Sequence, residues 1–199
     1  MKANFDRVLP LLLKHEGGFS NNPADPGGAT NRGITLNTFR EVHGKHKTVD
    51  DLKRISDSEL RHIYKTRYWD AVRGDDLPAG VDYAVFDFAV HSGPSRAVKY
   101  LQKILMVRQD GIVGPQTLSV LARAKAEHVV EVLCMERLKF LQSLSTWPTF
   151  GKGWKRRVED VQRNALAMIP AGHELEAEHR SWLARIVEIV RSIFQRART

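Results

Sequence analysis

The sequence predicts a mostly α-helical protein with one small β-hairpin or irregular insertion near residues 20–35. Apolar residues recur at helical spacing over most of the chain. The segment 20–35 differs, because it is dense in Gly, Pro, Asn and Asp, the residues of turns. The length of 199 residues, with 42% hydrophobic and 27% charged residues, is typical of a globular protein with a buried core.

The first half of the chain contains the insertion between helices. A helix is predicted over residues 5–16, ended by Gly17 and Gly18. Residues 30–35 are predicted to form a short strand or hairpin, and helical spacing resumes over 36–42. Ser56 with Glu59 three residues later is a capping box, which predicts a helix from there through Trp69.

The second half predicts helices throughout. Residues 81–90 are apolar nearly all round, which is typical of a helix buried on most sides, and Ser92-Gly93-Pro94 breaks it. An Asp-Gly turn then delivers Pro115 to the first position of another helix. Further helices are predicted over residues 98–105, 126–145, 155–168 and 173–198, with a Pro/Gly/aromatic loop over 147–154.

The net charge of +8 is unevenly distributed. Residues 1–92 hold 13 Lys/Arg and 13 Asp/Glu, whereas residues 93–199 hold 18 and 10. A basic half indicates an anionic partner, namely nucleic acid, an anionic membrane surface or an acidic cell-wall polymer. A solvated helical surface explains the same charges. No nucleic-acid-binding motif is present, so we expect no specific nucleic-acid partner.

Several classes of protein are excluded or disfavoured by what the sequence lacks. No apolar run approaches the ~20 residues of a membrane span, and we expect no secretory signal peptide. Cys134 is the single cysteine, so no internal disulfide forms. His43 and His46 share one helix face without a third ligand, so we expect neither a metal site nor a cofactor.

Two carboxylates near the insertion are suited to acid–base chemistry. Glu16 lies near the apolar stripe of the first helix and at its C-terminus, and both placements are expected to raise its pKa. Asp25 lies in a polar turn and is expected to stay ionised. Such a pair can cleave a glycosidic bond, and Thr30 and Thr35 could hold a water or a sugar hydroxyl. The alternatives are a solvated glutamate and an aspartate that only stabilises its turn.

Glu16 and Asp25 lie within a long motif that resembles one of a known family. The segment His15-Glu16-Gly17-Gly18-Phe19, followed by Asn-Pro-Ala-Asp-Pro-Gly-Gly-Ala-Thr-Asn-Arg-Gly-Ile-Thr over 22–35, resembles the signature of the glycoside hydrolase family 108 muramidases. The similarity continues through residues 68–78 and 87–93, and reaches the Asp-Gly-Ile-Val-Gly-Pro-Gln-Thr segment over 110–117. The resemblance implies a lysozyme-like helical fold with a catalytic region over 1–93. It also implies a helical peptidoglycan-binding region over 94–168 packed on it. Beyond the resemblance, apolar residues on one side and arginines elsewhere predict a basic amphipathic helix over 173–199.

The resemblance also implies roles for individual residues. Glu16 would be the essential acid. Phage-type lysozymes, which are more distant, place an aspartate nine residues after their catalytic glutamate and a threonine shortly beyond, which Asp25 and Thr30 match. At the end of the buried helix the family pattern has asparagine where this chain has His91, whose contact with a sugar carbonyl would depend on pH.

Three further residues have two interpretations each. Tyr68 and Trp69 could stack on sugar faces or pack in the core. Asp87, within the apolar helix, either contacts substrate or forms an internal salt bridge, because a buried carboxylate needs partners.

The resulting hypothesis is an N-acetylmuramidase acting on peptidoglycan glycan strands in the bacterial cell envelope or periplasm. Glu16 would protonate the leaving oxygen while Asp25 orients a water, which predicts inversion and carboxyl groups roughly 6.5–9.5 Å apart. A lytic transglycosylase and a non-catalytic cell-wall-binding protein are the alternatives. Members of the family serve as prophage endolysins and with secretion machines. The C-terminal helix, with an Arg-rich face and an apolar side, is a candidate contact with an anionic membrane or a secretion machine, or it packs on the body.

Overall fold

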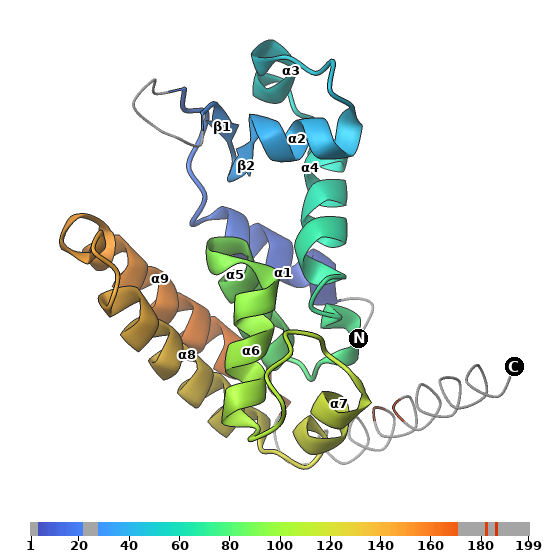
Figure 1. Cartoon of the computed structure of the whole chain (residues 1–199), viewed down its shortest axis with the longest axis vertical. Helices are drawn as coiled ribbons and strands as arrows, with labels where there is room; N and C mark the ends of the chain where they lie inside the picture. The colour runs from blue at the N-terminus through green and yellow to red at the C-terminus, as the bar shows by residue number, and fades with distance from the viewer. Residues whose placement is uncertain (1–3, 22–27, 171–181, 183–185, 187–199) are drawn as a thin grey trace, which may run out of the picture. The chain divides into compact units, whose positions relative to one another are not determined.

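The computed structural model describes residues 4–21, 28–170, 182 and 186. The chain divides into two compact units, Ala3–Trp69 and Asp70–Thr199, the latter joined by Met1–Lys2. Helices make up most of both units, and the first also holds a two-stranded antiparallel sheet (Figure 1). The predicted fold class, mostly α with a small hairpin, is confirmed.

The unit Ala3–Trp69 places a hairpin between helices. Its elements are α1 (Asn4–Leu13), β1 (Thr30–Asn31), β2 (Ile34–Thr35), α2 (Leu36–His43), α3 (Val49–Lys53), α4 (Asp57–Tyr64) and the π-helical turn η1 (Lys65–Trp69). Helix α1 buries the stripe that the sequence predicts, including Phe5, Val8 and Leu12. The hairpin pairs Thr30 with Thr35.

Side-chain caps fix where the helices of this unit begin. The Thr35 hydroxyl accepts from the backbone N–H of Thr38 and starts α2 directly after the hairpin. The predicted capping box at the start of α4 is confirmed, because Ser56 and Glu59 each bond to the other's backbone N–H. The continuous helix expected through Trp69 changes instead to the π-helical turn after Tyr64.

Helix α1 ends three residues earlier than predicted. The backbone N–H groups of His15 and Glu16 bond to the carbonyls of Leu12 and Leu13, at 2.9 and 3.2 Å, and this tight turn closes the helix at Leu13. Glu16 therefore lies just beyond the helix rather than in its last turn.

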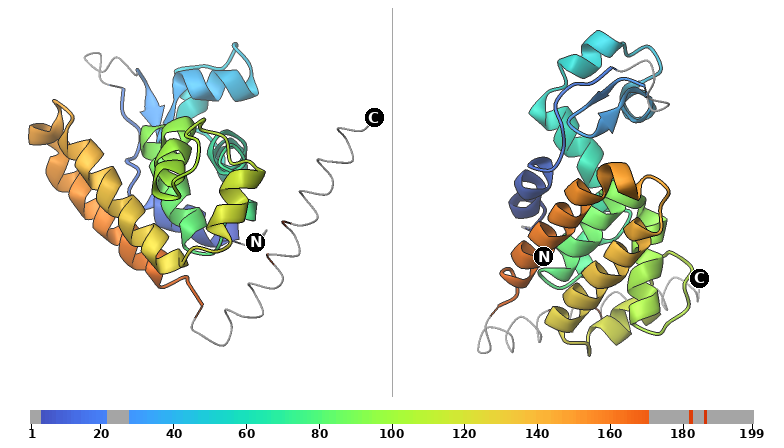
Figure 2. Two further views of the ribbon diagram at one scale, coloured as in Figure 1. Left: turned by 60° about the horizontal axis from the view of Figure 1, so that its bottom comes forward. Right: turned by 90° about the vertical axis from the view of Figure 1, so that its left-hand side faces the viewer.

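The unit from Asp70 onward is built around a buried helix. Its elements are η2 (Gly74–Asp76), α5 (Val81–Ser92), α6 (Pro94–Ile104), α7 (Pro115–Leu121), α8 (Ala126–Gln142) and α9 (Trp147–Leu166). Every residue of α5 from Val81 to Ala89 is buried, as its apolar sequence predicts. It packs against α6, α8 and α9, and the last two lie side by side (Figure 2).

The Pro/Gly/aromatic segment 147–154 is helical, and the prediction of a loop is wrong. Pro148 occupies the first turn of α9, where its missing N–H costs no hydrogen bond. A Cβ atom on Gly151 would lie only 2.6 Å from two ring atoms of Trp147, so the glycine lets this indole lie flat against the helix.

Most of the predicted C-terminal helix over 173–199 lies outside the described residues. Trp182 and Ile186 are described, and Trp182 contacts the body of this unit. The Trp182 indole N–H donates to the carbonyl oxygen of Asp76 at 2.8 Å, and Ile186 is buried.

Candidate active site

Glu16 lies at the meeting point of the segment after α1, the hairpin turn and α4. Its side chain is half-buried. The hairpin turns through Arg32 and Gly33, which have φ angles of 49° and 76°. Two successive residues with positive φ are the requirement of a type I′ turn, in which glycine is favoured. The turn places the Gly33 backbone directly against the Glu16 carboxylate.

Glycine is also required at position 33 because the neighbouring side chains leave no room for a Cβ atom. A Cβ atom on Gly33 would lie 2.6 Å from Glu16 Oε2 and 2.9 Å from Glu16 Cδ, and it would also collide with the Tyr64 hydroxyl. A side chain at this position would force the carboxylate and the hydroxyl to move. The absence of a Cβ therefore lets a carboxylate and a phenol meet at the hairpin turn.

The hairpin that carries Gly33 is fixed on both sides. The Tyr64 hydroxyl, at the end of α4, donates to the carbonyl oxygen of Arg32 at 2.8 Å. The buried Asn31 amide donates to the carbonyls of Leu52 and Lys53, at 2.9 and 3.2 Å. These bonds hold the turn, and with it the surroundings of Glu16, in one arrangement.

Tyr68 lies close to Glu16, whereas the ring of Trp69 is buried in the core. Tyr68 is half-buried and its ring packs against Tyr64 with centroids 5.8 Å apart. Burial raises the pKa of Tyr68, and the negative charge of Glu16 raises it further. Trp69 has no exposed surface and packs on Phe5 at 5.5 Å. The predicted sugar stacking by Trp69 is therefore wrong, because a ring without exposed surface cannot meet a sugar.

The two threonines of the hairpin have structural partners. Thr30 donates to the carbonyl oxygen of Gly28 at 3.3 Å, and Thr35 caps α2 and lies 3.0 Å from the Thr38 hydroxyl. They face each other as a cross-strand pair. Their contact with substrate stays a prediction. Asp25 lies in the segment 22–27, outside the described residues.

Asp87 is the centre of a buried ion-pair cluster in the unit from Asp70 onward. Arg157 Nε lies 3.0 Å from Asp87 Oδ1 and its Nη2 lies 3.0 Å from Oδ2, while Arg137 Nη1 lies 2.7 Å from Oδ1. Burial would raise the pKa of Asp87, but the two guanidinium groups outweigh it and lower the pKa to about 2. Asp87 is fully buried, so the predicted substrate contact is wrong and the internal salt bridge is correct.

His91, in the last turn of α5, is a neutral side chain at neutral pH. Burial lowers its pKa to about 4, aided by the positive charges of Arg137 and Arg157 and opposed by Asp87. Its ring packs edge-on against Trp154 at 5.6 Å, and its buried Nδ1 has no hydrogen-bond partner among the described residues. Its contact with a sugar stays a prediction.

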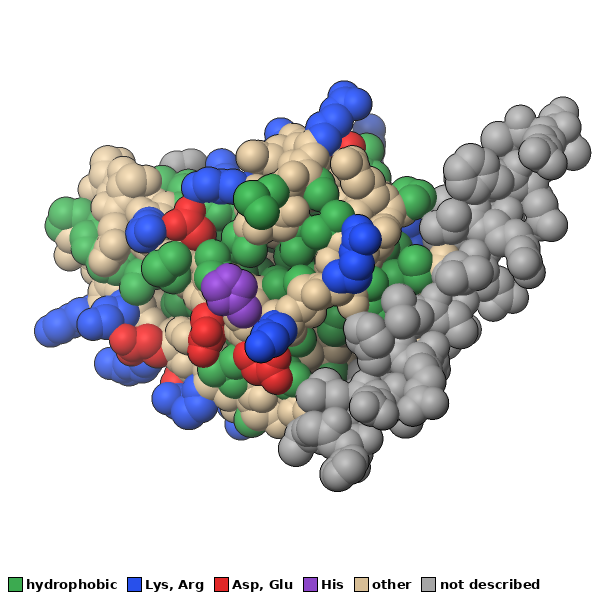
Figure 3. Space-filling model, turned by 90° about the horizontal axis from the view of Figure 1, so that it is seen from below, with side chains coloured by type: hydrophobic (Ala, Val, Ile, Leu, Met, Phe, Trp, Pro, Cys, Tyr) green, Lys and Arg blue, Asp and Glu red, His purple; other side chains and the backbone are tan. Residues whose placement is uncertain are grey.

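Metal binding, membrane spanning and a basic binding surface can each be compared with the described residues. Within residues 4–21, 28–170, 182 and 186, three or more His, Cys, Asp or Glu side chains never gather as a metal ion would require. The helices described there are also too short or too polar to span a membrane. On the face seen in Figure 3, Lys and Arg side chains alternate with acidic ones rather than forming one basic patch.

Sequence reasoning did not identify Gly33 and Tyr64 as site residues. Gly33 could have been found, because glycine at the second position of a two-residue hairpin turn indicates a constrained backbone. Tyr64 carries no such signal, since only the tertiary fold brings the end of α4 to the hairpin.

Comparison with known proteins identifies the family of the chain. The sequence model of Glycosyl hydrolase 108 matches residues 9–93, and that of Predicted Peptidoglycan domain matches residues 96–159. A solved structure, "Structure of Brucella abortus SagA", is similar at 46% identity with a TM-score of 0.78. The similarity covers 84% of this chain and 97% of that one. A search of curated proteins finds no match.

The two matched models define a glycoside hydrolase that acts on peptidoglycan, in the cell envelope of bacteria. Its helices and small hairpin are those expected of a lysozyme-like fold. The chain belongs to the glycosyl hydrolase 108 family.

Proposed function

We propose that the protein is an N-acetylmuramidase, which hydrolyses the β-1,4 bond between N-acetylmuramic acid and N-acetylglucosamine. In this proposal Glu16 is the general acid that protonates the leaving oxygen. The observation that carries the proposal is the Glu16 carboxylate held against the Cα of Gly33 beside the Tyr64 hydroxyl. This site lies within the part of the chain matched by the hydrolase family.

The surroundings of Glu16 are suited to a general acid. The group must stand within hydrogen-bond reach of the glycosidic oxygen in a fixed direction. The turn at Gly33 fixes one side of the carboxylate, and the aromatic rings of Tyr64 and Tyr68 line its neighbourhood. Exposed Gly17 and Gly18, which follow Glu16, present no side chains to an approaching glycan.

Asp25 is proposed as the residue that orients the attacking water. This role comes from the sequence, in which Asp25 follows Glu16 by nine residues in the family motif. Attack by water on the face opposite the leaving group would invert the configuration at the anomeric carbon. Thr30, on β1, is the neighbouring hydroxyl proposed to assist it.

The products distinguish this proposal from a lytic transglycosylase, in which the sugar's own hydroxyl attacks and no water is consumed. Purified peptidoglycan is digested in water labelled with heavy oxygen, and the fragments are analysed by mass spectrometry. A muramidase gives reducing muramic acid ends that carry the label. Anhydro ends without the label would overturn the hydrolytic mechanism.

A non-catalytic wall-binding protein is distinguished by the same digestion. The wild-type protein is expected to release soluble fragments, whereas a binding protein would sediment with intact peptidoglycan and release none. Of the two described residues of the tail, Trp182 donates a hydrogen bond to Asp76 and Ile186 is buried, so we do not assign the tail to a membrane or a secretion machine.

A further inference from the structure

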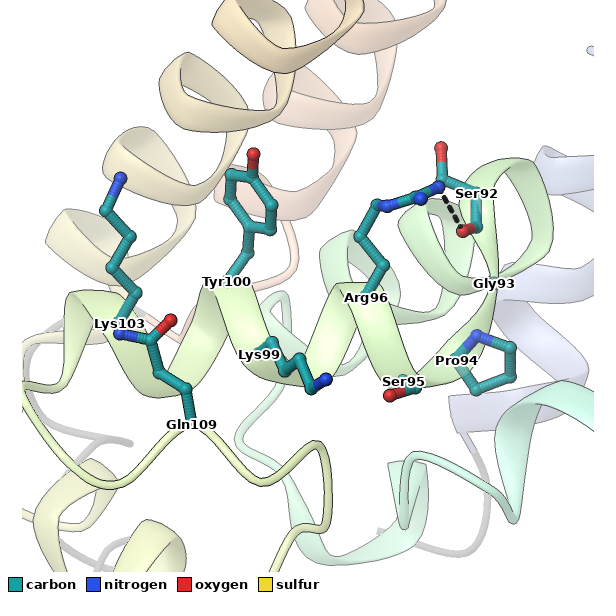
Figure 4. Close-up of a pocket in the computed structure, with 9 residues that line it drawn as sticks. All are labelled: Ser92, Gly93, Pro94, Ser95, Arg96, Lys99, Tyr100, Lys103 and Gln109. Atoms are coloured by element: carbon teal, nitrogen blue, oxygen red, sulfur yellow. Dashed lines mark hydrogen bonds between the residues drawn. The ribbon is translucent and has the colours of Figure 1, made fainter.

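A pocket of about 740 Å³ opens along α6 in the unit from Asp70 onward. It is lined by residues 92–96, by three further positions of α6 and by Gln109. In Figure 4, Arg96, Tyr100 and Lys103 extend from α6 in one direction, and the Lys99 side chain runs along the helix beside Ser95. Its volume lies within the range of sites that bind small ligands.

The pocket is lined by three cations and no carboxylate. Arg96, Lys99 and Lys103 follow one another at intervals of three and four residues, which places them on neighbouring positions of the helix surface. Lys103 is neutralised by Glu136 at 2.6 Å. Neither Arg96 nor Lys99 forms an ion pair with a residue that the structure describes, so the pocket retains uncompensated positive charge.

Arg96 is held in place without a carboxylate. Its Nη1 donates to the carbonyl oxygen of Ser92 at 3.0 Å, and its guanidinium lies over the Phe140 ring at 4.7 Å. Tyr100 packs against the same Phe140 at 5.9 Å. A positioned guanidinium beside an aromatic wall is suited to bind a carboxylate whose neighbouring atoms are apolar.

The N-terminus of α6 adds to the positive electrostatic potential of the pocket. Gly93 caps the helix without a side-chain hydrogen bond, Pro94 follows, and the first turn holds no acidic residue. The positive end of the helix dipole at the pocket is therefore not offset by a local carboxylate. The helix dipole strengthens the attraction of the cationic side chains for an anion, but it would not define a binding site without them.

We propose that this pocket binds the free carboxylates of the peptide stems that peptidoglycan carries along its glycan strands. The match to Predicted Peptidoglycan domain begins at residue 96 and contains Arg96, Lys99, Lys103 and Gln109. The amino sugars of the glycan are uncharged once the peptide is attached, so the anionic groups of the polymer are the carboxylates of its peptides. This assignment rests on the proposed action on peptidoglycan.

The test uses the full chain carrying Glu16→Gln, so that no ligand is consumed. A synthetic muramyl peptide with free carboxylates is titrated by calorimetry, and its fully amidated form is the matched ligand. The variant Arg96→Gln/Lys99→Gln is expected to bind the free peptide about tenfold more weakly, a change that corresponds to loss of exposed charge pairs. Binding of the amidated form is expected to be weak in both proteins.

Arg123→Gln/Lys125→Gln is the matched control, because both residues are exposed, belong to the same unit and do not line the pocket. It removes the same two positive charges as the test variant and is expected to leave peptide affinity unchanged. Thermal unfolding checks that each variant is folded, which we expect because Arg96 and Lys99 are exposed.

Three results would overturn the assignment: equal affinity of the double variant and its parent, equal binding of the free and amidated peptides, or tighter binding of inorganic phosphate than of the peptide. The failure of this assignment is separate from that of the catalytic proposal. If only the pocket is misassigned, the charge variants built on the wild-type chain still cleave peptidoglycan. If the digestion in labelled water gives unlabelled products or none, the chemistry proposed for Glu16 is wrong.

Discussion

Substitution of Gly33 by alanine tests whether the hairpin turn positions the Glu16 carboxylate. The new methyl group would lie 2.6 Å from Glu16 Oε2 and 2.9 Å from Cδ. To reach an ordinary contact of about 3.5–4.0 Å, the end of the glutamate side chain must move by roughly 1 Å. The Tyr64 hydroxyl, which would collide with the new methyl group, must also shift, which weakens its hydrogen bond to the carbonyl oxygen of Arg32.

The expected effect on activity is larger than that on stability. Alanine at a positive φ of 76° costs roughly 1–2 kcal/mol of folding free energy. A displacement of about 1 Å in a catalytic group lowers kcat by about 100-fold. Gly33→Ala should therefore remain folded at room temperature but turn over peptidoglycan about two orders of magnitude more slowly.

Gly28→Ala is the control for backbone strain. Gly28 has a similar φ of 67°, but no described residue lies within 4 Å of a Cβ built there. Chemical denaturation should show that Gly28→Ala loses the stability due to backbone strain alone and that Gly33→Ala loses somewhat more, because its methyl group also displaces Tyr64 and Glu16. Turbidity loss of a peptidoglycan suspension should show a large activity loss in Gly33→Ala alone. Equal activity of the two variants would refute the claim that Gly33 positions Glu16.

Two further predictions concern the ionisable groups of α5. Asp87→Asn leaves two buried guanidinium groups without their carboxylate and should lower the free energy of unfolding by about 3–5 kcal/mol in urea denaturation; a loss no larger than that of a surface substitution would contradict the ion-pair account. His91 has a folded pKa of about 4 against 6.5 unfolded, so the unfolded state binds more protons between these values and stability should fall as the pH drops from 6.5 to 4. His91→Asn should flatten this slope in unfolding curves measured across that range, and an unchanged slope would show that His91 does not titrate as inferred.

The helices could be predicted where local sequence and tertiary packing agree. The capping box at Ser56 and the all-apolar helix over 81–90 needed no long-range information, because a hydrogen-bonding pair and a burial pattern define them. The segment 147–154 could not be predicted, since its proline and glycines favour a loop locally. Stacking of Phe150 on Trp154 at 5.7 Å and the fit of Trp147 over Gly151 outweigh that preference.

The chemistry proposed for the candidate site comes from the sequence, whereas the way the site is built comes from the fold. The sequence makes Glu16 a candidate because an acid beside two glycines in the family motif suits glycoside cleavage. It cannot distinguish Tyr68 from Trp69, as adjacent aromatic residues enter opposite environments only once the π-helical turn forms. A buried Asp87 demands cationic partners, but only the fold shows that α8 and α9 supply them as Arg137 and Arg157.

The most direct test of the central claim is the turnover of peptidoglycan by Glu16→Gln. Glutamine has nearly the same shape as glutamic acid but cannot donate an acidic proton, so the surroundings at Gly33 are retained. The rate at which new reducing ends appear should fall by about 10²–10⁴-fold, the contribution typical of a general acid, while the variant still sediments with peptidoglycan. Reducing ends released at the wild-type rate would contradict the assignment of Glu16 as the proton donor.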